Sequence, residues 1–360
     1  MRPVTPPSNR RPLRRTIHEV ARRARVSTST VSRTINSPAL VEAETARRVW
    51  KAIKELEYYP NTQARSLVSG RSRIIGLIVS DITNPFFPEL VKSFEDVAAQ
   101  HGYDILVSST NYDSARTAAC VRRMLERKVD GVAIMTSEMD DHLIAQLAHG
   151  KVPMVFLDTG PIGEHISNIV VDYAMGVNEA VEHLVALGHR RIGFVSGPLG
   201  LKSAHVRRSA FLQALERYGI REDEALVQEG NHKVDGGIKA MTRMLEQTKA
   251  PTAVLGSNDL TAIGMLSALR RAGLEVPRDI SVVGFDDIWL AQFTEPPLTT
   301  VRLSQNEIAD KAFRALLADL GAAPEGAAKP DCTMETHLVI RQTTCQADPA
   351  RTFSEVLSSH

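Results

Sequence analysis

From residue 74 onward, short β-branched runs alternate with longer amphipathic stretches, and this alternation constrains the fold more than any other feature. The first series predicts strands at 74–79, 105–107, 132–135 and 155–157, with helices after Pro88, up to Lys128 and over 140–149. The second series predicts strands at 192–195, 253–255 and 281–284, with helices over 203–218, 234–247 and 259–272. Such alternation is typical of parallel sheets flanked by helices, so the two series predict an α/β body of two lobes.

The segment before residue 60 has a purely helical pattern. Residues 16–19 (TIHE) form a T-x-x-E capping box, which marks the start of a first helix. Ser27 is a favourable N-cap for a second helix that runs to about residue 35, and a third helix spans roughly 44–56. Three short helices that share one small apolar seam predict an all-α head in front of the α/β body.

Charge is divided unevenly between these two parts. The formal net charge is only +1, but residues 1–73 carry sixteen Lys and Arg against five Asp and Glu. The rest of the chain carries 27 Lys and Arg against 37 Asp and Glu. A basic head on an acidic body indicates that the head meets a polyanion, with a basic tail that merely aids solubility as the alternative.

The two ends of the chain predict little order. Residues 1–15 are rich in Pro and Arg and predict a disordered basic arm, and residues 347–360 have too little apolar content to predict more than a flexible tail. No run approaches the ~18 apolar residues of a membrane span, and no apolar segment follows the N-terminal arginines as it would in a secretory signal. We therefore expect a cytoplasmic protein with no membrane contact.

Motifs of enzymes and metal sites are missing from the sequence. Cys120, Cys332 and Cys345 are scattered without metal-ligand spacing, so we expect reduced cysteines, no metal and no cofactor. The chain has no P-loop and no G-x-S-x-G element. Its SGPLG run at 196–200 lacks the G-x-G-x-x-G spacing and is weak evidence for a nucleotide. We expect a protein that is not an enzyme.

The second predicted helix has an unusual composition. Its sequence VSTSTVSRTIN (26–36) is rich in Ser and Thr, which are mediocre helix formers but short enough to reach base edges and phosphates in a major groove. In a helix-turn-helix, the first residues of this helix face the bases, here Thr28 and Ser29. Arg33 suits a bidentate contact with guanine. The alternative is an exposed polar helix in an unrelated bundle.

The head resembles that of the lactose-repressor (LacI/GalR) family of transcriptional regulators. The resemblance rests on VSxxTVSR (26–33), on Tyr58-Tyr59-Pro60-Asn61 and on A-R-S-L (64–67), and it continues with lower specificity through Arg341. It implies a DNA-binding domain over 16–60 and a hinge over 61–71 that folds on DNA and inserts Leu67 into the minor groove as an apolar wedge. The DNA-binding residues that it implies are Thr16, Ser27, Thr28, Ser29, Thr30, Ser32, Arg33, Asn36, Asn61, Ala64, Arg65 and Leu67.

The resemblance also implies a body with the fold of periplasmic sugar-binding proteins. This effector-binding and dimerisation domain would span 72–346, with lobe 1 at about 72–171 and 299–330 and lobe 2 at about 172–298 and 331–346. Ligands of open parallel sheets lie beyond the carboxyl ends of the strands. Carboxylates and arginine in such a place suit a polyhydroxylated molecule. The effector-binding residues implied are Phe86, Phe87, Asp158, Ser203, Arg207, His232, Asn258 and Asp286.

The function implied is that of a sequence-specific repressor, a homodimer on a pseudo-palindromic site in double-stranded operator DNA. A small polar effector, a sugar or sugar derivative, would control its affinity from between the lobes. A purine-like corepressor and a sugar-binding protein that does not bind DNA are the alternatives. His232 stands where relatives often have a large aromatic residue, and Met135 stands where some sugar sensors have a polar one. The identity of the effector therefore does not follow from the effector of any relative. Asp259 and Asp287 are either ligand contacts or helix N-caps.

Overall fold

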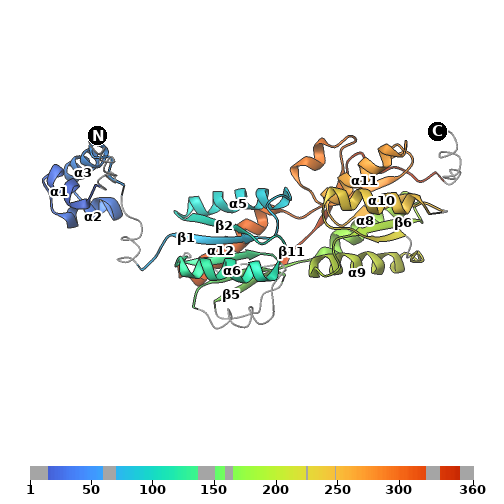
Figure 1. Cartoon of the computed structure of the whole chain (residues 1–360), viewed down its shortest axis with the longest axis horizontal. Coiled ribbons are helices and arrows are strands. Elements are labelled where there is room, and N and C mark those ends of the chain that lie inside the picture. Colours follow the sequence, from blue (N-terminus) through green and yellow to red (C-terminus); the bar gives the residue numbers. More distant parts are fainter. Residues whose placement is uncertain are drawn as a thin grey trace, which may run out of the picture. The chain divides into compact units, whose positions relative to one another are not determined.

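The computed structural model describes residues 15–59, 70–136, 151–158, 165–223, 226–247, 249–321 and 333–348 (Figure 1). Most of the predicted arm, hinge and tail, and the helix expected over 140–149, lie outside these residues. The chain divides into two compact units, residues 1–72 and 73–360.

The head is the predicted bundle of short helices. Its elements are α1 (Ile17–Ala24), α2 (Thr28–Asn36), the 3₁₀ helix η1 (Pro38–Leu40) and α3 (Ala43–Glu55). The Glu19 carboxylate accepts a hydrogen bond from the Thr16 amide at 2.8 Å, as the capping box predicts. A left-handed residue, Arg25 with φ 55°, ends α1 and turns the chain toward α2. The small core that joins the helices consists of Val20, Ala21, Ala24, Val31, Val49 and Ala52.

The first lobe of the body is built on a parallel sheet with the strand order β11-β5-β4-β3-β1-β2. The strands are β1 (Ile74–Val79), β2 (Asp104–Ser109), β3 (Gly131–Met135), β4 (Met154–Leu157), β5 (Ile166–Val171) and β11 (Thr333–Met334). The helices are α5 (Phe86–Gln100), α6 (Ser114–Glu126) and α12 (Gln305–Asp319). Helix α5 begins before Pro88, at Phe86, because a proline in the first turn lacks only an N–H that has no partner within the helix.

The second lobe is built on a sheet with the strand order β12-β10-β9-β8-β6-β7, in which only β12 is antiparallel to its neighbour. The strands are β6 (Ile192–Ser196), β7 (Val227–Glu229), β8 (Ala253–Gly256), β9 (Ser281–Asp286), β10 (Thr299–Arg302) and β12 (His337–Val339). The helices are α8 (Tyr173–Ala186), α9 (Lys202–Arg217), α10 (Val234–Leu245), α11 (Asp259–Arg271) and the 3₁₀ helix η3 (Trp289–Phe293). The predicted α/β body of two lobes is thus confirmed.

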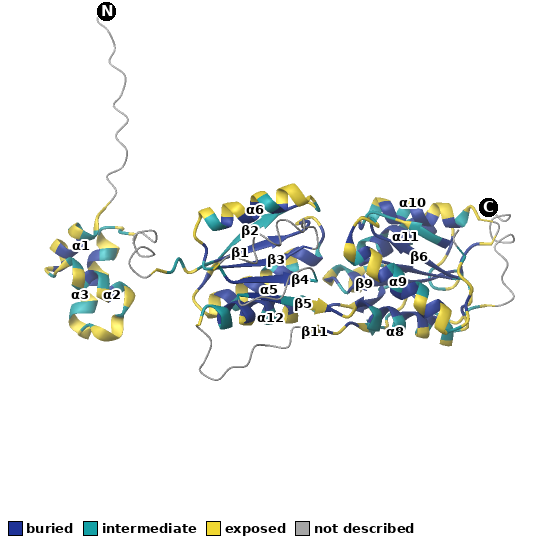
Figure 2. Ribbon diagram, turned by 90° about the horizontal axis from the view of Figure 1, so that it is seen from below, coloured by how far each residue is buried: buried dark blue, intermediate teal, exposed yellow. Residues whose placement is uncertain are grey.

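Each sheet lies between helices, and strand periodicity explains why. In β1, Ile75 and Leu77 belong to the cluster that contains Phe94 of α5 and Phe313 of α12, whereas Ile78 packs in the cluster of Met124 on α6. Alternate side chains of a strand point to opposite faces, so one apolar run serves both layers. Figure 2 shows the result: buried strands in both lobes, and helices whose exposed residues face outward.

The chain passes between the lobes later than predicted at one crossing. Residues 299–302 were expected in the first lobe, but β10 pairs with β9 and β12 of the second sheet. Its residues Thr299, Thr300 and Val301 are fully buried there, and only the following helix α12 packs on the first sheet. The short strand β11, expected in lobe 2, pairs instead with β5 of the first sheet.

Candidate functional site

Helix α2 of the head presents a polar stripe to solvent. Ser29, Arg33 and Asn36 recur at helical spacing and are exposed. Below them Val31 and Thr34 are buried, so the helix has one inner face and one face free for a partner. Positively charged and amide side chains on such a stripe can donate and accept hydrogen bonds in a DNA groove.

The other predicted DNA-binding residues of the head differ in their exposure and contacts. The Ser27 hydroxyl accepts the Thr30 amide at 3.1 Å and lies 2.7 Å from the Ser29 hydroxyl, so it caps α2 as the sequence predicts. Thr16 is exposed at the start of α1, whereas Thr28, Thr30 and Ser32 are partly buried. The predicted hinge contacts lie outside the described residues, namely Asn61, Ala64, Arg65 and Leu67.

A single pocket in the body brings together all eight predicted effector-binding residues. It encloses about 570 Å³ of space between protein atoms, its open mouth included. Most of its lining follows the carboxyl ends of strands in both sheets, the expected place for a ligand of parallel sheets. The lining residues are Ser80, Asn84, Phe86, Phe87, Tyr112, Met135, Thr136, Leu157, Asp158, Tyr173, Ser203, Arg207, His232, Asn258, Asp286 and Leu303.

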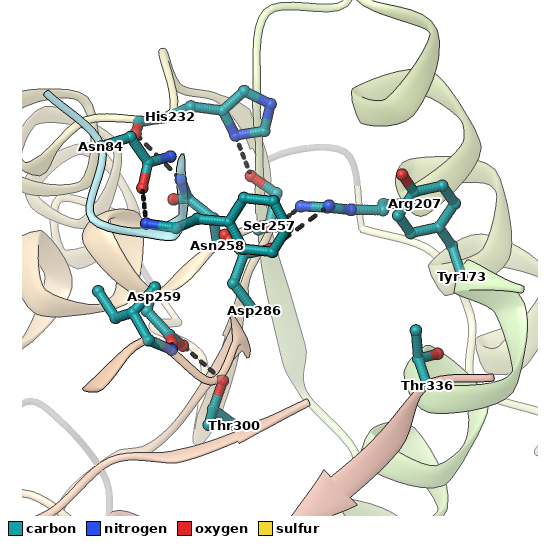
Figure 3. A network of polar contacts seen from close by, with 12 residues as sticks. Asn84, Tyr173, Arg207, His232, Ser257, Asn258, Asp259, Asp286, Thr300 and Thr336 are labelled. Carbon is teal, nitrogen blue, oxygen red and sulfur yellow. Dashed lines mark hydrogen bonds and ion pairs between the residues drawn. The ribbon is translucent and has the colours of Figure 1, made fainter. Parts of the chain in front are cut away.

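Arg207 of α9 is the central cation of the pocket (Figure 3). Its guanidinium carbon lies 4.7 Å from the ring centre of Tyr173 and 4.2 Å from that of Phe285. One terminal nitrogen donates to the Ser257 carbonyl, and the other lies 3.5 Å from the Asp286 carboxylate. The Nε atom is buried and has no hydrogen-bond partner among the residues that the structure describes. A buried donor without a partner is costly, so this nitrogen is suited to a hydrogen bond with a bound molecule.

Asp286 is the last residue of β9 and stands in an unusual backbone conformation. Its φ is 108°, a region that side chains rarely adopt, and its side chain is only 7% exposed. Burial raises the pKa of Asp286 to about 7; Arg207 opposes the rise and Glu89 adds to it. The strained, buried carboxylate is therefore held at the pocket wall against the preferences of backbone and solvation, as is common at functional sites.

Asp158 follows β4 on the other side of the pocket. Its carboxylate accepts hydrogen bonds from the Val171 amide at 2.8 Å and from the Tyr173 hydroxyl at 2.6 Å. Burial raises the pKa of Asp158, while these two bonds and the charge of Arg207 act in the opposite direction. The carboxylate therefore joins two chain segments, whatever it contributes to a ligand.

His232 and Asn258 form the wall opposite Tyr173 (Figure 3). Burial lowers the pKa of His232 to about 3, with Arg207 as a second cause, so its imidazole is neutral. Its Nδ1 lies 3.3 Å from the Ser257 hydroxyl. The ring packs on Gly197, where an added Cβ would lie 2.0 Å from Nε2, and this contact accounts for the first glycine of the SGPLG run.

Asn258 has a second role in the same wall. Its side chain caps α11 by accepting the Thr261 amide at 2.9 Å, and its amide donates to the His232 carbonyl at 3.0 Å. Both ends of the Asn258 side chain are thus engaged within the protein. Its role toward an effector stays a prediction.

Two carboxylates beside the pocket are structural braces. Asp259 is fully buried and accepts hydrogen bonds from the Ile288 amide at 2.8 Å and from the Thr300 hydroxyl. Asp287 pairs with Arg302 at 2.7 Å and with Arg341 at 2.5 Å. Neither is an N-cap, and neither lines the pocket.

Sequence reasoning missed several lining residues, above all the two tyrosines. Tyr112 has φ 58° in the loop that follows β2, and Tyr173 begins α8 directly after β5. The rule that ligands lie beyond strand ends would have pointed to Tyr112. Tyr173 carried no such signal, because β5 itself was not predicted.

Neither a metal site nor a membrane span is apparent in the part of the chain that the structure describes. Within those ranges, no three His, Cys, Asp or Glu side chains come together as metal ligands. Likewise, among the described helices none is long and apolar enough to cross a bilayer.

Comparisons with known proteins agree with this architecture. Residues 16–61 match the model of bacterial regulatory proteins of the lacI family, and residues 181–344 match the periplasmic binding protein-like domain. The HTH-type transcriptional repressor PurR of Aliivibrio salmonicida (strain LFI1238) is 35% identical over 303 residues, which are 84% of this chain and 91% of the relative.

Two solved structures extend the likeness to both units. The lac repressor dimer bound to operator and the anti-inducer ONPF is 33% identical with a TM-score of 0.80, over 92% of this chain and 99% of that chain. The complex of the transcriptional regulator CelR with cellobiose is 30% identical with a TM-score of 0.66, over 92% of this chain and 100% of that chain. The chain is a member of the LacI family of bacterial regulatory proteins.

Proposed function

We propose that this protein is a repressor that binds operator DNA as a homodimer and responds to a small effector held between its two lobes. The observation that carries the proposal is one chain with both an exposed polar recognition helix and a lobe-bridging pocket that contains Arg207 and Asp286. A single recognition helix reads few bases, so a two-fold dimer on a pseudo-palindromic site doubles the readout. The lac repressor relative is described as a dimer bound to operator.

The chemistry of the pocket favours an uncharged, polyhydroxylated effector. The charged residues among its described lining are Asp158, Asp286 and Arg207, and Arg207 already contacts Asp286 and the Ser257 carbonyl. A phosphate group would meet two carboxylates and an engaged guanidinium, whereas hydroxyl groups can donate to the carboxylates and accept from Arg207. A carbohydrate fits this set, and the CelR relative binds cellobiose.

A purine-like corepressor is the second candidate. Phe86 and Phe87 lie edge to face at 5.3 Å between ring centres and, with Tyr112, supply flat apolar surface to the pocket. A planar heterocycle could stack on such surface while the neutral His232 offers a hydrogen bond to its edge. In either case we expect the effector to be released chemically unaltered, since the proposed role is that of a sensor in the cytoplasm and not of an enzyme.

The test is operator selection followed by an effector screen. Random double-stranded DNA would be selected on the full chain, and the selected site titrated in the presence of compounds that raise the melting temperature, drawn from sugars, sugar phosphates and purines. The proposal expects a two-fold symmetric site and at least one uncharged compound that changes operator affinity. Absence of any selected sequence would overturn the repressor function, and stabilisation by sugar phosphates alone would overturn the effector class.

A further inference from the structure

Asp158 of the first lobe receives hydrogen bonds from two residues of the second lobe. The Tyr173 hydroxyl, on α8, donates to its carboxylate at 2.6 Å, and the Lys202 ammonium, at the start of α9, donates to its backbone carbonyl at 2.6 Å. A third donor, the Val171 amide, holds the other carboxylate oxygen. Asp158 itself has φ 63°, in the left-handed region, which Asp adopts more readily than most residues other than glycine, and this conformation presents the carbonyl that Lys202 contacts.

Another hydrogen bond between the lobes lies away from Asp158. The Trp289 amide, in the η3 turn after β9, donates to the Glu89 carboxylate of α5 at 3.0 Å. Burial raises the pKa of Glu89 and the bond from Trp289 opposes that rise, in keeping with a contact partly shielded from water. Phe86 and Phe87 begin the same helix as Glu89, and Asp286 lies three residues before Trp289. This amide is therefore a reporter of how closely the two lobes approach around the pocket.

We propose that Lys202 is a positioning residue that clasps the two lobes together and sets how far the cleft closes before an effector arrives. Lys202 is exposed and does not line the pocket, so its contact with Asp158 acts on the lobes and not on a ligand directly. Ser203 and Arg207 share the helix that Lys202 begins. Closure through Lys202 therefore brings these two residues toward Asp158, and loss of the clasp moves the whole helix away. Its consequence for effector binding rests on the proposed function, but the clasp itself does not.

The clasp is suited to a modest, adjustable effect. A hydrogen bond to a charged donor is stronger than a neutral one, but exposure to water and the freedom of a lysine side chain reduce its contribution. Two arrangements of a two-lobed protein commonly differ by only a few kcal/mol, so a contact of this size can shift their populations by a measurable factor without being needed for folding.

The test is hydrogen exchange on the full chain without DNA or effector. In Lys202→Met the Trp289 amide should exchange roughly 3- to 10-fold faster than in the wild type, because the lobes open more often. Lys202→Arg should restore slow exchange, since a guanidinium also donates to a carbonyl. Lys239→Met is the matched control: this lysine is also exposed at a helix surface, where it pairs at 3.6 Å with Asp235 of its own helix, and its loss should leave the Trp289 amide unchanged.

Three results would overturn the clasp. These are an unchanged Trp289 amide in Lys202→Met, a failure of Lys202→Arg to restore slow exchange, and faster exchange that extends equally to the buried strand β8, which would indicate general destabilisation. None of these results depends on DNA or an effector, so the clasp can fail while the repressor function stands. Absence of operator binding in the wild type would be the separate failure of the proposed function.

Discussion

The guanidinium of Arg207 and the carboxylate of Asp286 lie 3.5 Å apart with their side chains 8% and 7% exposed, and together they form the charged centre of the pocket. A buried pair of this kind contributes little to stability by itself, because desolvation of two charges offsets their attraction. The placement of Arg207 in the second turn of α9, facing Asp286 at the end of β9, is better explained by a ligand that bonds to both.

The free energy of unfolding should decrease as the pH rises, because of Asp286. Its pKa in the folded protein is about 7, above the ordinary value of 3.8, so the folded state holds the proton more tightly than the unfolded chain does. This contribution is fully present below about pH 4 and is lost as the pH rises through about 7. In Asp286→Asn, which mimics the protonated acid and tolerates positive φ, that loss should be absent.

The expected gain of Asp286→Asn over the wild type is about 2–4 kcal/mol in the free energy of unfolding at pH 8, falling toward zero at pH 4. Urea unfolding of both proteins at pH 4, 6 and 8 measures it. Curves that stay parallel across this range would show that Asp286 does not titrate as its burial implies.

Gly197→Ala should damage the pocket without touching its charged centre. The new Cβ would lie 2.0 Å from Nε2 of His232, so the imidazole must leave its place in the wall. We expect effector affinity to fall by about 1–3 kcal/mol, or roughly 5- to 150-fold. Gly200→Ala is the control, because its Cβ would meet no atom within 4 Å. Calorimetric titration of both variants makes the comparison, and equal affinities would remove His232 from the effector site.

Arg33→Ala should weaken binding to the selected operator by about 1–3 kcal/mol, since a bidentate contact with guanine is lost from the exposed stripe of α2. Binding to random DNA should change much less, because Arg33 is one of many cationic residues in the head and the loss of one positive charge weakens phosphate contacts only slightly. Competition titrations at fixed salt compare the two. A loss of the same size on random DNA would mean that Arg33 contacts only the backbone.

Leu67→Ala should weaken specific binding by about 2–4 kcal/mol and leave non-specific binding almost unchanged, if Leu67 is the minor-groove wedge that the family resemblance implies. The kink in the operator should decrease as well, which the mobility of DNA with the site at its centre or its end can detect. A fully kinked operator in the Leu67→Ala complex would contradict the wedge.

Much of the architecture could be predicted from the sequence, because local signals and tertiary packing agree there. The capping box at Thr16, the Ser27 cap and the alternation of strands and helices all specify elements that then bury their apolar faces as expected. The lobe crossings were harder to predict. Strand β10 is short, and its assignment to the second sheet depends on pairing with β9 and on the Thr300–Asp259 hydrogen bond, which only the folded chain reveals.

The residues that line the pocket could be predicted from the sequence, but several of their hydrogen-bond partners could not. All eight expected residues line it, yet the sequence held no sign that the Asn258 amide donates to the His232 carbonyl, or that Asp158 is bonded by Tyr173 and Lys202 from the other lobe. Such contacts join residues far apart in the chain, so periodicity and motif spacing do not encode them.

The central claim is that occupancy of the pocket controls operator affinity. The direct measurement is titration of the selected operator with wild type and with Asp286→Asn, each with and without the effector found by screening. Asp310→Asn, which removes an exposed carboxylate that pairs with Arg314 on α12, is the control. The wild type and the control should change their operator Kd by roughly 5- to 150-fold when the effector binds, the usual range of such couplings. Asp286→Asn should bind operator as the wild type does without effector and should not respond to it. A wild type that binds the effector in the pocket but keeps the same operator Kd would contradict the account.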